Sequence, residues 1–210
     1  MSKIKLVLAT QNGGKIAELK RLAALYDVQV VNEQYPSLAS LNVEETGSSF
    51  YENSLLKLKA AQALVNDRSV YIVADDSGLE IPMLNNEPGV YTRRWAGYEM
   101  SDQEIIDYCL KKMSHLHSDD RKATFKTVLA VGRAGDYDVS YYTGELTGLI
   151  LTEPKPSVTE LEGFPFRALF YLPDQDKMIY EIQDLSGTTS FKTHREKAFA
   201  KMLQALRRRK

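Results

Sequence analysis

Two adjacent carboxylates, Asp75 and Asp76, follow an apolar, β-branched run from Val70 to Val73. The run predicts a buried strand that ends at these carboxylates, with Gly78 letting the backbone turn away. Like charges this close raise one another's pKa, and a divalent cation removes the conflict. Mg²⁺ prefers hard oxygen ligands of this kind. The same residues also suit a solvated turn, so the pair alone leaves both interpretations open.

A candidate phosphate-binding loop lies between the first predicted strand, residues 4–9, and a predicted helix whose apolar residues recur at helical spacing from Ile16. Backbone N–H groups at a helix N-terminus, together with the charge of Lys15, can hold a phosphate group. The loop is not a Walker A motif, which needs glycine where Ala9 stands and serine or threonine where Ile16 stands. A flexible turn is the alternative. The loop consists of Thr10, Gln11, Asn12, Gly13, Gly14 and Lys15.

A second lysine, Lys57, lies on a predicted helix over residues 50–65. Asn53 lies four residues earlier and therefore on the same side of that helix. The polar loop before the helix contains an acidic pair, Glu44 and Glu45. Taken separately, these residues fit a solvent-facing lysine and a solvated loop, so their function depends on what else lies nearby.

The remaining pattern predicts an α/β chain. His194 and Arg195 place two basic side chains at the start of the final predicted helix, beside its N–H groups. The basic end of that helix, residues 207–210, is favoured by the helix dipole and needs no nucleic-acid partner. The other predicted elements are a short strand at 28–31, a helix at 101–113, paired strands at 123–131 and 139–151, and short strands at 170–172 and 178–182.

Composition limits the class of protein. The chain has 210 residues and a net charge of −1, so there is no global basic field of the kind that binds nucleic acid. The single cysteine, Cys109, allows no internal disulfide and fits a reducing compartment. The apolar run at residues 4–9 is too short for a signal peptide or a membrane span. We expect a cytoplasmic protein with no membrane or nucleic-acid partner.

Four segments resemble one known family. They read ATQNGGKIAEL at residues 9–19, EETGSSFYENSLLKLKAA at 44–61, ADDSGLEIPMLNNEPGVYTRRWAG at 74–97 and THR at 193–195. In this order they resemble the Ham1-like inosine/xanthosine triphosphate pyrophosphatases. The resemblance covers nearly the whole chain and implies a single domain over residues 1–210. It also implies an elongated, two-lobed α/β fold with a central mixed β-sheet flanked by helices, a cleft between the lobes, and a homodimer.

The resemblance further implies hydrolysis of nucleoside triphosphates, in particular non-standard purine nucleotides such as ITP, dITP and XTP. Water attacks the α-phosphorus, and the products are a nucleoside monophosphate and pyrophosphate. The implied cofactor is Mg²⁺, with Mn²⁺ as the alternative ion. A metal suits this chemistry because it lowers the pKa of bound water and neutralises the triphosphate.

Carried over by position, the resemblance assigns a role to each candidate residue. Asp76, Lys15 and Lys57 are the catalytic residues, and Asp76 is the carboxylate that activates water. The implied metal ligands are Glu45, Asp75 and Asp76. The implied substrate contacts are the loop from Thr10 to Lys15, Asn53, Lys57, Ser77, Phe164, Phe166, Arg167, Lys192, His194 and Arg195.

The base-recognition segment departs from the family pattern. The family reads Gly-Phe-Gly-Tyr-Asp-Pro where this chain has residues 163–168, GFPFRA. The aromatic platform remains at Phe164, but the carboxylate that reads the base is replaced by Arg167, which only donates hydrogen bonds. The family's substrate lysine aligns loosely with Thr189, and Lys192 is the nearest replacement. The alternatives are therefore an enzyme with altered base preference, a nucleotide sensor without turnover, or a phosphatase that releases inorganic phosphate.

The departure at Arg167 predicts a change of substrate. Arg167→Asp restores an acceptor where the chain now has a donor, and an unmatched buried polar group costs about 1–3 kcal/mol. We expect the variant's preference to move toward ITP and XTP by about tenfold or more, measured as kcat/KM across a panel of nucleoside triphosphates. An unchanged substrate profile would contradict a role for Arg167 at the base.

Overall fold

The structure is a computed structural model, and it describes residues 3–155, 163–183 and 191–209. Thr189 lies outside the described residues. By compactness the chain divides into two units, and each is described by itself below. The first unit comprises Met1–Asp76, Thr127–Gly144 and Arg195–Lys210, and the second comprises Ser77–Lys126 and Glu145–His194.

The strands form one mixed sheet in the order β2-β1-β3-β5-β6-β7-β8, with β4 paired to β3. β1 pairs in parallel with β2 and β3, whereas β4, β7 and β8 pair antiparallel with their neighbours. The α/β class and the central mixed sheet flanked by helices are therefore confirmed. The strands are β1 (Lys5–Leu8), β2 (Gln29–Val30), β3 (Tyr71–Ile81), β4 (Glu87–Gly89), β5 (Lys122–Gly132), β6 (Ser140–Ile150), β7 (Phe170–Leu172) and β8 (Lys177–Met178).

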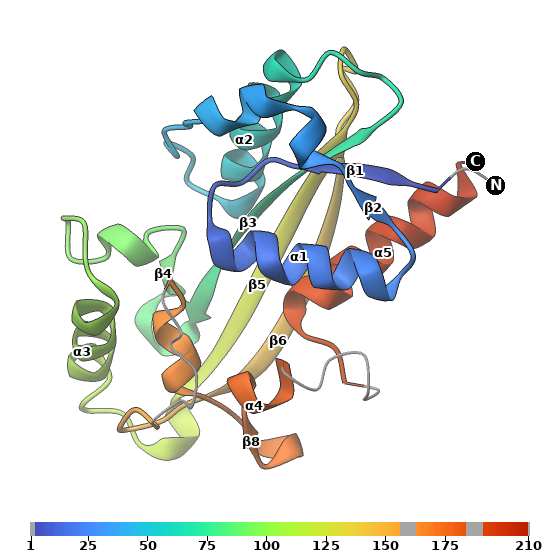
Figure 1. Ribbon diagram of the computed structural model, residues 1–210. Helices are drawn as coiled ribbons and strands as arrows, with labels where there is room; N and C mark the ends of the chain where they lie inside the picture. Colours follow the sequence, from blue (N-terminus) through green and yellow to red (C-terminus); the bar gives the residue numbers. More distant parts are fainter. Residues whose placement is uncertain (1–2, 156–162, 184–190, 210) are drawn as a thin grey trace. The chain divides into compact units, whose positions relative to one another are not determined.

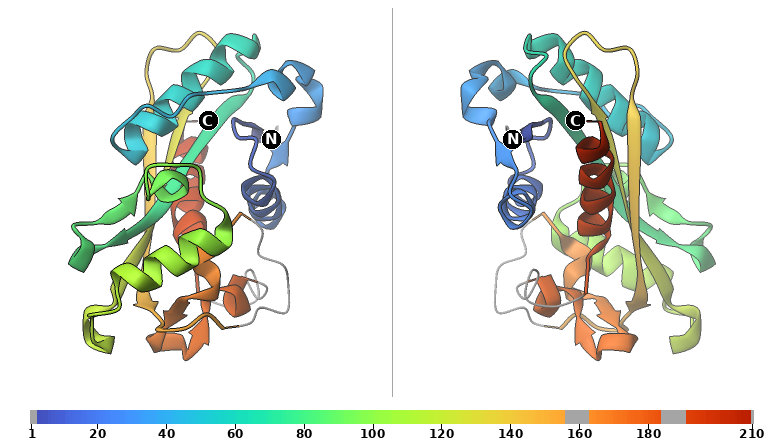
Figure 2. Two further views of the ribbon diagram at one scale, coloured as in Figure 1. Left: turned by 90° about the vertical axis from the view of Figure 1, so that its left-hand side faces the viewer. Right: turned by 90° about the vertical axis from the view of Figure 1, so that its right-hand side faces the viewer.

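Helices cover both faces of the sheet in the first unit (Figures 1 and 2). α1 and α5 pack with β1, β3 and β5 in one buried apolar cluster, and α2 packs in a second cluster on the opposite face. α1 begins after Asn12, whose side-chain oxygen accepts a hydrogen bond from the Lys15 backbone N–H, and Ser49 caps α2 in the same way. These helices are α1 (Gly13–Leu25), α2 (Phe50–Leu64) and α5 (His194–Arg208).

Successive residues of β3 belong to opposite clusters. Tyr71 and Val73 pack with α1 and α5, whereas Ile72 and Ala74 pack with α2. Because side chains alternate along a strand, the next two residues, Asp75 and Asp76, also face opposite sides.

The second unit has its own apolar core, built around Ile105 and Cys109 of α3 and Phe170 of β7. α3 begins with a complete capping box at Ser101. Gly148 of β6 allows a close approach, because a Cβ there would lie 2.5 Å from the Tyr171 carbonyl oxygen. The helices of this unit are α3 (Asp102–Lys112) and α4 (Ile179–Gln183).

Short 3₁₀ helices complete the described structure. They lie at Asn32–Gln34, Pro36–Ser40, Pro82–Leu84, Thr92–Arg94, Ser118–Asp120, Pro165–Ala168 and Pro173–Gln175. Over the described ranges, no helix has both the length and the apolar character needed to cross a bilayer.

Two predicted elements differ from the structure, one in its boundary and one in its type. The central strand does not end at Asp75, and Gly78 does not turn the chain, because β3 continues to Ile81. The strand continues because Leu79 and Ile81 are fully buried and this part of β3 pairs with β4. The strand predicted at 178–182 is instead the end of β8 followed by α4. The two-lobed shape with a cleft and the single domain over residues 1–210 stay predictions.

Candidate active site

Lys57 joins two of the predicted carboxylates. Its ammonium lies 2.7 Å from Asp76 Oδ1 and 3.2 Å from Glu45 Oε1. The three side chains come from α2, β3 and the loop before α2. Lys57 and Asp76 are buried, whereas the Glu45 side chain is 39% exposed. The structure thus brings Glu45, Lys57 and Asp76 together, on the face of β3 that α2 covers.

Burial sets the electrostatics of this pair. Burial raises the pKa of Asp76, and the Glu45 charge adds to that effect, so together they outweigh the Lys57 and Lys15 ammoniums. Burial by itself would lower the pKa of Lys57, but the charges of Asp76 and Glu45 raise it above its ordinary value. The Asp76 Oδ2 atom is buried and has no hydrogen-bond partner among the described residues. Asp76 is therefore a carboxylate with one oxygen fixed by Lys57 and one oxygen available to a ligand or a proton.

Asp75 belongs to a separate ion-pair network on the opposite face of β3. Its Oδ1 atom lies 2.8 Å from the Lys15 ammonium, and its Oδ2 atom accepts a hydrogen bond of 2.9 Å from Arg195 Nε. Arg195 also pairs with Glu18 at 2.6 Å. Although the carboxyl is fully buried, Arg195 and Lys15 hold the pKa of Asp75 well below its usual range.

This arrangement separates the three carboxylates that the resemblance implies as metal ligands. Glu45 and Asp76 share Lys57, whereas Asp75 faces Lys15 and Arg195 across the strand. Among residues 3–155, 163–183 and 191–209, no group of three or more His, Cys, Asp or Glu side chains is placed to hold a metal ion.

The predicted phosphate loop is held by its own side chains. Asn12 N–H donates to Thr10 Oγ1, and Lys15 N–H donates to Asn12 Oδ1 at 3.0 Å. The Gln11 side-chain amide donates to the Leu38 carbonyl oxygen. A Cβ at Gly13 would meet no atom of the described residues within 4 Å, so within that part of the chain this glycine leaves space at the start of α1.

Asn53 organises the loop that carries Glu45. Its buried side chain accepts a hydrogen bond of 2.8 Å from the Gly47 N–H, while its Nδ2 has no hydrogen-bond partner among the described residues. A Cβ at Gly47 would lie 2.6 Å from Asn53 Oδ1, so this contact requires glycine. Asn53 therefore fixes the loop and presents an amide donor.

The predicted base-recognition residues lie in the second unit. The Arg167 guanidinium lies over the Phe164 ring, 3.7 Å from its centroid, so one face of the predicted platform is covered. Phe166 is 3% exposed and packs edge-on against Trp95, so its ring belongs to the core. Ser77 and Lys192 are partly buried.

The two basic residues at the start of α5 are not a solvent-facing pair. His194 is buried and stacks on Phe125, with ring centroids 5.0 Å apart and the planes 13° from parallel. Arg195 is fully buried in its ion pairs with Asp75 and Glu18. Arg195 thus holds Asp75 in place, a role that the sequence pattern did not reveal.

Sequence reasoning missed Glu18 and Phe125. Glu18 is a buried acid beside Leu19 and Leu22, which form the apolar face of α1. An acidic residue next to an apolar helix face is a signal for a buried ion pair, because an unpaired buried carboxylate is costly. Phe125 reads as an ordinary strand residue, and nothing in its spacing indicates the stacking with His194.

Two solved structures with this fold are Ham1 proteins. The Staphylococcus aureus Ham1 protein superposes with a TM-score of 0.77 at 32% identity, covering 98% of this chain and 100% of that one. A HAM1 protein from Coxiella burnetii superposes with a TM-score of 0.75 at 28% identity, covering 98% of this chain and 99% of that one.

Sequence comparison agrees with the fold. The model of the Ham1 family matches residues 6–205. A dITP/XTP pyrophosphatase of Bacillus cereus is 34% identical over 94% of this chain and 92% of that protein. One from Staphylococcus aureus is 35% identical over 96% and 95%. The chain belongs to the Ham1 family.

The lowered pKa of Asp75 predicts a pH-dependent stability. A carboxyl with a lowered folded-state pKa stabilises the fold fully above its unfolded pKa of about 3.9, and the contribution is lost as the pH falls toward the folded value. We expect the free energy of unfolding of the wild type to fall more steeply from about pH 5 to about pH 3 than that of Asp75→Asn. The variant should also lose about 3–5 kcal/mol at neutral pH, because Lys15 and Arg195 lose their partner. Urea unfolding at a series of pH values measures both effects.

The control for this prediction is Asp138→Asn. Asp138 is exposed, and it makes no ion pair within the described part of the chain. Its variant should follow the wild-type pH dependence. If the free energy of unfolding fell equally steeply with falling pH in the wild type and in Asp75→Asn, the role given to the buried network would be contradicted.

Proposed function

We propose that this chain hydrolyses nucleoside triphosphates, in particular non-standard purine nucleotides such as dITP, ITP and XTP, to the nucleoside monophosphate and pyrophosphate. The relatives with the printed name dITP/XTP pyrophosphatase, which match over more than nine-tenths of the chain, support the reaction. The observation that carries the proposal is the buried Asp76 carboxylate, with one oxygen fixed by Lys57 and the other without a partner in the described chain.

The proposed reaction is a displacement at the α-phosphorus. The oxygen of a water molecule forms a bond to that phosphorus, a proton of this water passes to the Asp76 carboxylate, and the bond between the α-phosphorus and the oxygen that bridges to the β-phosphorus breaks. Pyrophosphate leaves with the electron pair of that bond. The raised pKa of Asp76, which burial causes, suits this role because a stronger base accepts a proton more readily.

The lysines neutralise the polyphosphate in this proposal. Most of the catalysis in phosphoryl transfer comes from positioning and charge stabilisation. In the structure Lys15 and Lys57 each pair with a β3 carboxylate, so their ammoniums are held in place before any substrate binds. The oxygens of a bound triphosphate can then contact these fixed ammoniums. They can also accept hydrogen bonds from the backbone N–H groups at the N-terminus of α1.

A divalent cation fits the Asp76 side of the strand. The unpartnered Asp76 Oδ2 and the partly exposed Glu45 carboxylate supply the hard oxygen ligands that Mg²⁺, or Mn²⁺ in its place, prefers. We propose that Glu45 and Asp76 hold this ion and that Asp75 supports them from the opposite face without binding it. When bound, the ion lowers the pKa of water and neutralises phosphate charge.

The base contacts are proposed from the resemblance. Phe164 offers a ring to a base, and Arg167, already stacked on that ring, offers hydrogen-bond donors. Altered base preference therefore remains the main alternative to ITP and XTP specificity. Substrate contacts by Ser77, Lys192 and His194, the homodimer, and the cytoplasmic location stay predictions.

A substrate panel tests the proposed function. The purified chain is incubated with Mg²⁺ and each of the common nucleoside triphosphates, ITP, dITP and XTP, and both pyrophosphate and inorganic phosphate are measured. We expect equimolar nucleoside monophosphate and pyrophosphate, with the highest kcat/KM for a non-standard purine nucleotide. Removal of divalent ions with EDTA should stop the reaction. Release of inorganic phosphate would identify a phosphatase, and no turnover with any substrate would favour a nucleotide sensor.

The role of Asp76 predicts the effect of one substitution. Asp76→Asn keeps the shape of the side chain but removes the proton acceptor and the anionic ligand, so kcat should fall by about 10²-fold or more. Circular dichroism and urea unfolding check that the fold is retained. The matched control is Asp27→Asn, an exposed carboxylate in the same unit at a positive φ that asparagine tolerates. Near-normal activity in Asp76→Asn would rule out Asp76 as the catalytic carboxylate.

A further inference from the structure

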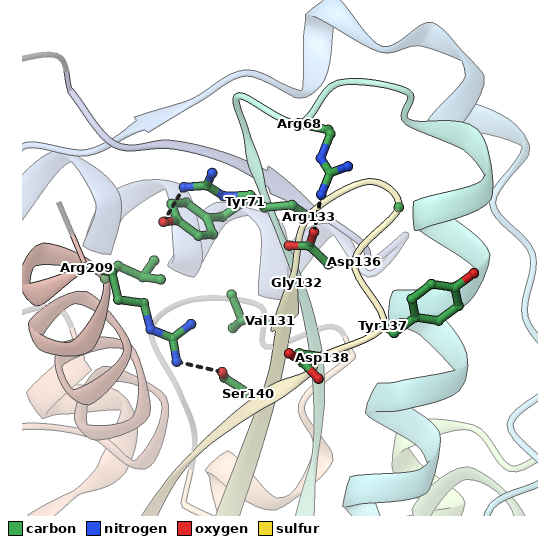
Figure 3. Close-up of a pocket in the computed structure, with 12 residues that line it drawn as sticks. Arg68, Tyr71, Val131, Gly132, Arg133, Asp136, Tyr137, Asp138, Ser140 and Arg209 are labelled. Atoms are coloured by element: carbon green, nitrogen blue, oxygen red, sulfur yellow. Dashed lines mark hydrogen bonds and ion pairs between the residues drawn. The ribbon is translucent and has the colours of Figure 1, made fainter.

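The first unit contains a hollow of about 670 Å³ that none of the predicted site residues lines (Figure 3). This volume falls within the range of small-molecule sites. Tyr71, which lines the hollow, lies five residues before Asp76 on β3, a separation of about 16 Å at the rise of a strand. The side chains that line the hollow include Tyr71, Val131, Arg133, Ser140, Leu206 and Arg209.

Tyr71 fixes the Arg133 guanidinium at this hollow. The guanidinium carbon lies 4.1 Å from the centroid of the Tyr71 ring, and one of its N–H groups donates to the Tyr71 hydroxyl. Tyr71 is itself 7% exposed and belongs to the apolar cluster under α1 and α5. Arg133 is therefore held by a buried ring, and its orientation is set before any ligand arrives.

Arg209 lies at the same hollow. It directly follows the last residue of α5, Arg208, and its guanidinium donates to Ser140 Oγ at 3.2 Å (Figure 3). Neither Arg133 nor Arg209 pairs with a carboxylate within residues 3–155, 163–183 and 191–209. By contrast, the third arginine of the hollow, Arg68, is neutralised by Asp136 at 2.8 Å.

The charges of the hollow favour an anion. Among the described residues that line it, the ionised side chains are Arg68, Arg133, Arg209, Asp136 and Asp138, which give a net charge of +1. Arg133 lies in the β5–β6 turn and Arg209 directly after α5, and both line the same hollow. Guanidinium groups bind the oxygens of phosphate in a planar, two-point geometry.

The Tyr71 ring does not suit stacking against a base. Tyr71 is buried, and one face of its ring is covered by Arg133. Recognition beside Tyr71 and Arg133 therefore depends on charge and hydrogen bonds rather than on stacking.

We propose that this hollow is a second binding site, for the phosphate groups of a small anion, with Arg133 and Arg209 as its main contacts. The anion is either free diphosphate or the phosphate of a nucleotide. The site does not depend on the hydrolytic reaction.

The test follows the arginine side chains directly. Two-dimensional ¹H–¹⁵N spectra of the arginine Nε–H groups are recorded for the whole protein without divalent ions, during titration with diphosphate or with AMP. We expect saturable shifts of the Arg133 and Arg209 signals, which the spectra of Arg133→Gln and Arg209→Gln assign. Each variant should weaken binding about tenfold or more, because a charge-assisted hydrogen bond is lost.

The matched control is Arg208→Gln, which removes the same charge from α5 one residue before Arg209 and outside the hollow. Its affinity should stay within about twofold of the wild type. Shifts with diphosphate alone identify the free anion as the ligand, and shifts with AMP identify a nucleotide. No saturable shift with either anion would overturn the proposal, as would an equal loss of affinity in Arg208→Gln.

Pyrophosphate release is measured on the same variants. Neither Arg133 nor Arg209 contacts the Lys57–Asp76 pair, so basal hydrolysis should be retained. The two proposals can therefore fail independently. A variant that loses anion binding but keeps hydrolysis shows that the hollow is not needed for turnover. Anion binding in a chain without turnover supports the second site even if the proposed function is wrong.

Discussion

The alternation of side chains along β3 is the constraint on which the site depends. Because neighbouring residues of a strand face opposite sides, Asp75 and Asp76 are adjacent in sequence and yet buried in different surroundings. Asp75 is neutralised by Lys15 and Arg195, and Asp76 by Lys57. Each carboxylate has its own cation, so a strand can run through two buried charges and continue to Ile81.

These ion pairs connect segments that are distant in sequence. Asp75 links α1 to α5, and Asp76 links β3 to α2. Buried ion pairs seldom stabilise a fold more than apolar packing would, although breaking one is costly. The three buried charges of Asp75, Arg195 and Glu18 are thus better explained by the need to fix the partly buried Lys15 at the start of α1 than by stability alone. The same reasoning gives Glu18 a role, since it neutralises the remaining charge of Arg195.

Tyr71 lies four residues before Asp75 on β3. Because side chains alternate along a strand, residues an even number of positions apart share a face, so Tyr71 and Asp75 lie on the same face of β3. α5 covers both places, with Arg195 near its beginning and Leu206 near its end. α5 therefore supplies Arg195 to the buried network, and the residue directly after this helix, Arg209, lines the hollow beside Tyr71. Both groups lie within the first unit.

The sequence by itself determined the elements and the residue types of the site. Periodicity and capping residues were sufficient for α1, α2, α3 and the β5–β6 pair, and the motif residues from Thr10 to Lys15 and around Asp76 pointed to phosphate chemistry. Only the tertiary structure decided which charges meet. Asp75 and Asp76 look like one pair in the sequence, and Arg195 looks like a phosphate ligand, because a sequence shows neighbours along the chain. Strand alternation and helix packing then place Arg195 against Asp75 and leave Asp76 to Lys57 and Glu45.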